Sequence, residues 1–154
     1  MRNGEMLSKA LLIATNAHAG QFDRGWRPYI LHPLAVMSIL RSEDDELNTI
    51  AILHDVIEDS NVTFKDLADQ GISDRVIEAV RALTKMPGQS YEEYKNAIFS
   101  NHDAMMVKSA DLTHNSDIKR LKGIREKDIE RISRYHRFYL EIQEKLRISK
   151  LGDN

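Results

Sequence analysis

The chain has 154 residues, of which 42% are hydrophobic and 30% are charged, and its formal net charge at pH 7 is −2. This length is typical of one domain with a substantial core, and the balance of charges excludes a global attraction to nucleic acid or to an anionic membrane. The chain has no cysteine, which excludes disulfides, thiolate metal sites and thiol catalysis, so metal ligands must be histidines or carboxylates.

The N-terminal region shows no targeting signal and no membrane anchor. It contains only one short apolar run, residues 10–14, and no stretch approaches the roughly 20 apolar residues that span a bilayer. We therefore expect a cytoplasmic protein without a membrane or nucleic-acid partner.

Apolar residues recur at spacings of three and four along the chain, which predicts an all-α fold. The first helix is expected over residues 5–20, with Gly20 as its stop. Pro33 suits the first turn of the second helix, so His32 is expected at the mouth of that helix, facing inward. The later helices are expected at residues 33–41, 46–59, from 63 onward, 74–85, 91–100, 104–112 and 127–146.

Several helix starts carry residues that cap the free N–H groups of the first turn. Thr63, with Asp66 three residues later, predicts a capping box, and Ser73 and Ser90 are the predicted caps of the next two helices. Residues 147–154 are predicted to form a flexible tail after a single domain that spans residues 1–146.

The third predicted helix contains the stretch "AILHDVIEDS", which places four ionisable side chains among apolar ones. On a continuous α-helix these four side chains would share an arc of roughly 140°. They are His54, Asp55, Glu58 and Asp59. One alternative is a solvated polar face at a helix end. Three carboxylates this close oppose one another unless a cation lies among them, and this favours a bound divalent ion.

Such an ion needs further ligands from other parts of the chain. His32 and Asp111 are the candidates, because one precedes Pro33 and the other is a carboxylate within an apolar helical segment. Each has a structural alternative. His32 could form a hydrogen bond in the core, and Asp111 could cap a helix or pair with Lys108.

The order His, His-Asp, Asp resembles the HD-domain phosphohydrolases. Within that superfamily the chain is similar to the hydrolase domain of the RelA/SpoT type and its small single-domain relatives. The likeness extends from His18 to Tyr135. The segments that resemble family motifs, in order and spacing, are "AHAGQ", "PYILHP", "LHDVIEDS", "LTK" and "VKSADLTHN".

This resemblance implies an HD-type hydrolase that uses a divalent metal, most often manganese, to cleave the 3′-pyrophosphate from (p)ppGpp, giving GDP or GTP and pyrophosphate. The implied partner is a small nucleotide, and the oligomeric state is not predicted. Glu58 and Asp59 would handle the attacking water, one helical turn beyond the metal pair. The implied metal ligands are His32, His54, Asp55 and Asp111.

A phosphate-rich substrate also needs cations, and the planar guanidinium of arginine suits phosphate oxygens well. For any single Lys or Arg the alternative is a solvated surface charge. The residues that the resemblance assigns to substrate contact are Arg24, Lys85, Asn115, Arg131 and Tyr135.

The segment "FDRGWR", residues 22–27, departs from the family pattern. Where the alarmone hydrolases commonly have an arginine, two residues after the Gln, this chain has Asp23, and Arg24 is displaced by one position. Trp26 occupies a usual glycine position. It could stack on a nucleobase or cover the edge of the pocket. The changes leave the metal chemistry untouched and bear on base recognition.

Two other functions are compatible with the sequence. The same metal chemistry could act on another nucleotide or phosphate ester. A domain of a different class would bind a nucleotide or a protein without turnover. The complete set of metal ligands, together with Glu58 and Asp59, argues against this second alternative.

Overall fold

The computed structural model describes residues 1–2 and 4–152. Within these residues it contains helices and no strand, apart from an isolated antiparallel bridge between Phe22 and Pro28, so the predicted all-α class is confirmed. The helices are α1 Glu5–Ala17, α2 Leu31–Leu40, α3 Asp45–Leu53, α4 Val56–Asp59, α5 Phe64–Asp69, α6 Asp74–Leu83, α7 Tyr91–Phe99, α8 His102–Asn115, the 3₁₀ helix η1 Ile118–Arg120 and α9 Glu126–Gly152.

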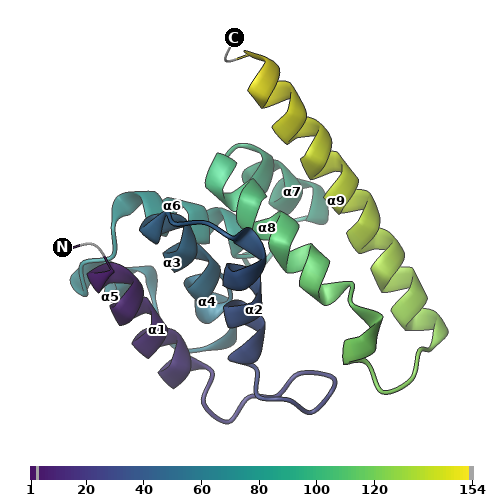
Figure 1. Ribbon diagram of the computed structural model, residues 1–154, viewed down its shortest axis with the longest axis horizontal. Coiled ribbons are helices and arrows are strands. Elements are labelled where there is room, and N and C mark those ends of the chain that lie inside the picture. The colour runs from purple at the N-terminus through teal and green to yellow at the C-terminus, as the bar shows by residue number, and fades with distance from the viewer. Residues whose placement is uncertain (3, 153–154) are drawn as a thin grey trace.

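Helix α3 lies at the centre of the fold (Figure 1), where it packs against α1, α2, α6 and α8. Its apolar residues face neighbours on all sides, and Ile50, Ile52 and Leu53 have no exposed surface. Burial of each such side chain contributes about 1.5–3 kcal/mol. The C-terminal end of α3 is therefore held rigidly by the core, and any side chain placed there is fixed with it.

Helix α9 runs along one side of the molecule, where it packs against α8 (Figure 1). Phe138, Ile142 and Leu146 are its buried apolar residues. The sequence predicted the helix end at residue 146, but the structure continues the helix to Gly152, and residues 153–154 lie outside the described part. Even α9 is not a membrane span, because no helix of the described residues is long and apolar enough to cross one.

The predicted helix caps are confirmed. The Thr63 side chain accepts from the Asp66 N–H, and Asp66 accepts from the Thr63 N–H in return, which forms a capping box. Ser73 and Ser90 accept from N–H groups in the first turns of α6 and α7. These local signals fix where the helices begin because they satisfy N–H groups that have no partner within the helix.

Two helices near the candidate ligands differ from the prediction. Helix α2 begins at Leu31 and not at Pro33, so His32 lies within its first turn, where the ring of Pro33 is still tolerated. The predicted helix 46–59 is broken into α3 and α4 at residues 54–55. Asp55 has φ −105° and ψ −4°, which lie at the edge of the right-handed helical region. The prediction of one continuous helix is therefore wrong, although the backbone keeps its right-handed turn through the break.

Candidate metal centre and adjoining pocket

Two histidines and two aspartates converge at one buried point. His32 comes from the first turn of α2, and Asp111 comes from α8. His32 Nε2 lies 2.8 Å from Asp111 Oδ1 and 3.6 Å from Asp55 Oδ2. At the break between α3 and α4, His54 Nε2 lies 3.1 Å from Asp55 Oδ2 and 3.4 Å from Asp111 Oδ1. The break thus brings both members of the His-Asp pair to the two distant ligands.

His54 has a free nitrogen within this cluster. Its Nδ1 lies 2.7 Å from the carbonyl oxygen of Ala51, which can only accept, so Nδ1 carries a proton. In the neutral ring Nε2 is then a bare lone pair, and among the described residues its polar neighbours are oxygens of Asp55 and Asp111, which can also only accept. Buried polar atoms without partners are rare and costly. A cation held by His54 and Asp55 would satisfy this nitrogen, so the site fits a metal.

The two carboxylates also affect the protonation of His54. Burial opposes a charged ring, but Asp55 and Asp111 outweigh burial and raise the pKa of His54 well above its ordinary value. When no ion is bound, a protonated His54 ring therefore supplies the positive charge that stabilises the two carboxylates. A metal ion would replace that proton.

His32 is oriented by a second histidine. Its Nδ1 lies 2.7 Å from Nδ1 of His114, and the two rings are stacked with centroids 5.0 Å apart. Burial, followed by the charge of Arg120, lowers the pKa of His114 to about 4, so its ring is neutral at pH 7. A neutral His114 can accept a hydrogen bond from the N–H at His32 Nδ1. The other ring nitrogen of His32, Nε2, is then free to act as a ligand.

The two aspartates are held by neighbours that donate to them. The Tyr29 hydroxyl donates to Asp55 Oδ2 at 2.6 Å. Asp111 Oδ2 accepts from Lys108 Nζ at 2.8 Å, and Asp111 Oδ1 accepts from Asn115 Nδ2 at 2.9 Å. Burial opposes the charge of Asp111, but Lys108 and the two histidines keep its pKa well below the ordinary value. Both carboxylates are therefore ionised and oriented before any ion arrives.

The donor set suits a divalent transition metal. Atoms of His32, His54 and Asp55 that could serve as ligands all lie within 4.8 Å of one another, and Asp111 adds a second carboxylate beside both rings. Imidazole with carboxylate is the combination that binds such ions in the absence of cysteine. The described residues thus hold a His/His/Asp group that could bind one divalent ion.

Glu58 and Asp59 lie in α4, next to this cluster, and each residue keeps part of its surface in solvent. The backbone N–H of Lys85 donates to the Glu58 carboxylate. Partial burial of the carboxyl groups raises the pKa of Glu58 and of Asp59, and the charge of Asp55 raises both further. Two carboxyl groups with raised pKa values beside a metal cluster are suited to accept a proton from water.

A cavity of about 370 Å³ adjoins the cluster. Tyr29, which donates to Asp55, is part of its wall, so the cavity reaches the second layer of the metal site. Its charged and polar lining includes four residues predicted to contact substrate, namely Arg24, Asn115, Arg131 and Tyr135. The volume is within the range of small-ligand sites.

The sequence profile of the HD domain matches residues 29–153, which is most of the chain. The chain belongs to the HD domain family. The residues that converge as candidate ligands, from His32 to Asp111, all fall within the matched region.

Several curated proteins are similar to this HD domain. It is 34% identical over 141 residues to the bifunctional (p)ppGpp synthase/hydrolase SpoT of Escherichia coli K12. This alignment covers 83% of this chain and 20% of SpoT. It is also 34% identical over 143 residues to a guanosine-3′,5′-bis(diphosphate) 3′-pyrophosphohydrolase of Vibrio cholerae. That alignment covers 84% of this chain and 20% of the other protein. The chain thus spans about a fifth of the length of these relatives.

A solved structure has the same fold. It comes from work on a metazoan ortholog of SpoT that hydrolyses ppGpp, and it matches this HD domain with a TM-score of 0.73 at 23% identity. The match covers 92% of this chain and 87% of the other. At this identity the likeness concerns the fold.

The four predicted ligands of the HD domain lie together. The structural alternatives also describe real contacts, because His32 is within hydrogen-bond distance of Asp111 and Asp111 pairs with Lys108. Lys85 is the exception among the predicted substrate contacts. It is exposed, contacts Glu58 through its backbone, and is not among the residues that line the cavity.

The unusual loop of residues 22–27 is built around Asp23. Its Oδ1 accepts from the N–H groups of Gly25 and Arg27, and its Oδ2 lies 3.2 Å from Arg120 Nη2. A Cβ atom on Gly25 would lie 2.5 Å from the carbonyl oxygen of Arg120, so no side chain fits there. The loop and the η1 segment are therefore packed closely together.

Sequence reasoning missed three residues that support this site: Tyr29, His114 and Arg120. Tyr29 and His114 lie within the quoted motifs "PYILHP" and "VKSADLTHN", which was the available signal. Arg120 lies outside every motif. It donates to the carbonyl oxygen of His114 and pairs with Asp23, and both contacts arise only from the tertiary fold.

Proposed function

We propose that this HD domain removes the 3′-pyrophosphate of guanosine alarmones, converting (p)ppGpp to GDP or GTP and pyrophosphate, with Mn²⁺ as the metal. One observation carries the proposal. The cluster of His32, His54, Asp111 and the half-buried Asp55 adjoins a cavity of small-ligand size whose wall includes three arginines. The activities of the similar SpoT and pyrophosphohydrolase proteins, as their names describe them, favour this substrate.

A divalent ion, when bound, supplies a Lewis acid that activates water and polarises a phosphoryl oxygen. The chain itself would supply the proton acceptor. Water would add to the phosphorus attached to the ribose 3′ oxygen, and the bond to that oxygen would break. Glu58 or Asp59 would take the proton of the water, and the 3′ oxygen would receive a proton as it leaves, which gives the ribose 3′ hydroxyl and free pyrophosphate. Their raised pKa values bring these carboxyl groups closer to neutral pH, where a general base works best.

The cavity would hold the nucleoside and its phosphates. Arg24 and Arg131 offer guanidinium groups, of which Arg131 is held by Asp128 at 2.8 Å. Such preorganised cations lose little side-chain entropy when phosphate binds. Tyr135 and Asn115 complete the wall, and Asn115 also touches the ligand Asp111, so it links the substrate cavity to the metal cluster.

The experiment is metal analysis combined with a nucleotide screen. We expect about one divalent ion per chain, as a single four-ligand site predicts, and release of pyrophosphate from ppGpp with Mn²⁺. A chain that retained no ion, and that no divalent metal activated, would overturn the proposal. The cytoplasmic location and the lack of a nucleic-acid partner stay predictions.

A second candidate is hydrolysis of another nucleotide or phosphate ester by the same site. The observation that favours it is the Asp23–Arg120 pair, which places a carboxylate in the cavity wall where the family commonly has a cation. In the same screen, a good substrate other than an alarmone, with ppGpp inert, would decide for this candidate. A protein that bound nucleotides but turned none over would be a regulator.

A further inference from the structure

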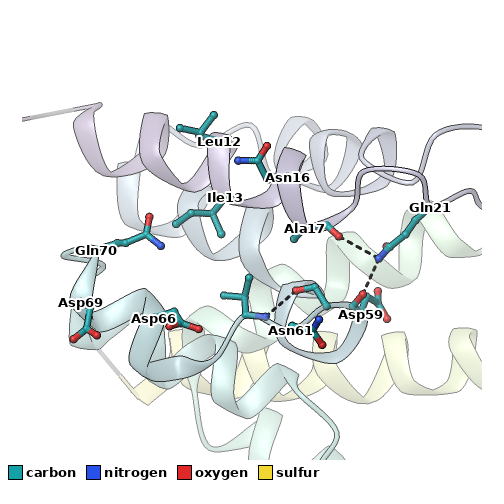
Figure 2. A pocket seen from close by; sticks show the side chains of 12 residues that line it. Leu12, Ile13, Asn16, Ala17, Gln21, Asp59, Asn61, Asp66, Asp69 and Gln70 are labelled. Carbon is teal, nitrogen blue, oxygen red and sulfur yellow. Dashed lines mark hydrogen bonds between the residues drawn. The ribbon is translucent and has the colours of Figure 1, made fainter.

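A groove of about 850 Å³ lies between α1 and the segment that contains α4 and α5 (Figure 2). Asp59 lies at one end of this groove, where the Gln21 side chain approaches it. Asp59 is therefore open to solvent on this side while it also responds to Asp55 of the metal cluster.

The orientation of the Gln21 amide is fixed by two carbonyl groups. Its Nε2 donates to the carbonyl oxygens of Ala17 at 3.2 Å and of Asp59 at 2.7 Å (Figure 2). Both partners can only accept, so the amide nitrogen must face them. The amide oxygen of Gln21 then faces the ring of His18, at 2.8 Å from its Nδ1.

This contact fixes the tautomer of His18. Because the Gln21 oxygen can only accept, His18 Nδ1 must carry a proton, and in the neutral ring Nε2 is a bare lone pair. His18 is 2% exposed, and its Nε2 is buried without a hydrogen-bond partner among the residues that the structure describes. Packing alone does not explain such a buried acceptor.

Among the described residues, no neighbour donates a hydrogen bond to this nitrogen. The ring packs on Tyr29 with centroids 4.9 Å apart, but the Tyr29 hydroxyl donates to Asp55. Gln21 bonds to both the His18 ring and the backbone carbonyl of Asp59, so a single side chain joins the ring to this residue. An ionised Asp59 can only accept. A water molecule, which can donate to both groups, suits the position.

We infer that His18 is a positioning residue for Asp59, and that its Nε2 accepts a hydrogen bond from a buried water molecule beside the Asp59 carboxylate. The inference rests on the proposed hydrolysis, in which Asp59 handles water. His18 would then act on Asp59 from two sides. Its Nδ1–H orients Gln21, which holds the Asp59 backbone, and its Nε2 orients the water at the Asp59 side chain.

Two substitutions separate these roles, because each amide side chain replaces one ring nitrogen. His18→Asn keeps a donor near the Nδ1 position and loses the Nε2 acceptor. His18→Gln keeps an acceptor near the Nε2 position and loses the Nδ1 donor. We expect H18N to lower kcat by about 10- to 100-fold, with KM and metal content unchanged, whereas H18Q recovers most of the activity. The exposed His102→Asn serves as the matched control.

Other outcomes overturn the inference. If H18Q lost more activity than H18N, only the anchor on Gln21 would matter, and if both kept or both lost full activity, the lone pair would have no specific role. Nitrogen-15 NMR of the unsubstituted protein gives a readout without turnover. Nε2 should be unprotonated, and its shift should move in D59N. If ppGpp proved inert, the proposed function would fail, and this NMR result alone would decide on His18.

Discussion

The ammonium group of Lys108 lies 2.8 Å from Asp111 Oδ2, and both side chains are largely buried. Lys108 thus neutralises a carboxylate whose other oxygen faces the two histidines of the metal cluster. The pair is both a structural element and a part of the candidate site, so a change in either residue has consequences for stability as well as for metal binding.

Replacement of Asp111 by Asn should therefore destabilise the metal-free protein, because it leaves the buried charge of Lys108 without a partner. We expect a loss of about 3–5 kcal/mol in the free energy of unfolding, measured by urea denaturation. The double variant D111N/K108M should recover much of this stability but no metal binding. If D111N alone were as stable as the unsubstituted chain, the pair would be of no structural importance.

Metal binding should become tighter as the pH rises. In the metal-free protein Asp55 and Asp111 raise the pKa of His54 well above its ordinary value, so an ion must displace a proton from this ring at pH 7. Release of one proton makes the apparent affinity rise about tenfold per pH unit until the pH passes this raised pKa. Calorimetric titration with Mn²⁺ in buffers of different ionisation enthalpy counts the protons released. An affinity independent of pH between 6 and 8 would contradict this expectation.

Replacement of Glu58 by Gln should remove activity without removing the metal. The amide oxygen can still accept from the Lys85 N–H, so the local structure should persist, but the amide cannot take a proton from water. We expect kcat to fall by about 10²- to 10⁴-fold, with an unchanged metal content. The exposed Glu78→Gln on α6 is the control for a simple loss of charge. Full activity in E58Q would leave Asp59 as the only carboxylate available for this role.

Trp26 should report nucleotide binding directly, since it is the only tryptophan in the chain. It is 77% exposed, has a left-handed φ of 62°, and lines a pocket of about 660 Å³ with Arg24 and Arg131, which also line the inner cavity. We expect GDP to quench its fluorescence and pyrophosphate, which has no base, to leave it unchanged. W26A should weaken nucleotide binding by about 1–3 kcal/mol. Equal signals from GDP and pyrophosphate would favour the role of a pocket edge.

The sequence predicted four candidate ligands that the structure brings together, because their order along the chain is distinctive and one pair is adjacent. It could not place the break between α3 and α4. The apolar periodicity continues across residues 54–55, and only the structure shows that the helix is interrupted there. The prediction of one continuous helix is therefore wrong, although His54 and Asp55 do reach the same site.

The supporting residues were beyond sequence reasoning for a different reason. Tyr29 contacts Asp55 across 26 positions, His32 contacts His114 across 82, and Arg120 contacts Asp23 across 97. No local pattern encodes such pairs, because tertiary packing alone brings them together. Lys85 shows the converse. Its motif position was clear from the sequence, yet its side chain is not in the cavity wall.

The Asp23–Arg120 pair limits which substitutions the loop of residues 22–27 can accept. An arginine at position 23 would face Arg120 with a like charge, and the hydrogen bonds that Asp23 accepts from the N–H groups of Gly25 and Arg27 would be lost. The loop has no room to move toward Arg120, because even a Cβ atom on Gly25 would lie 2.5 Å from the carbonyl oxygen of Arg120. A substitution at position 23 therefore requires a matching substitution at position 120. A single-residue graft from a relative would damage the loop before it could alter the choice of substrate.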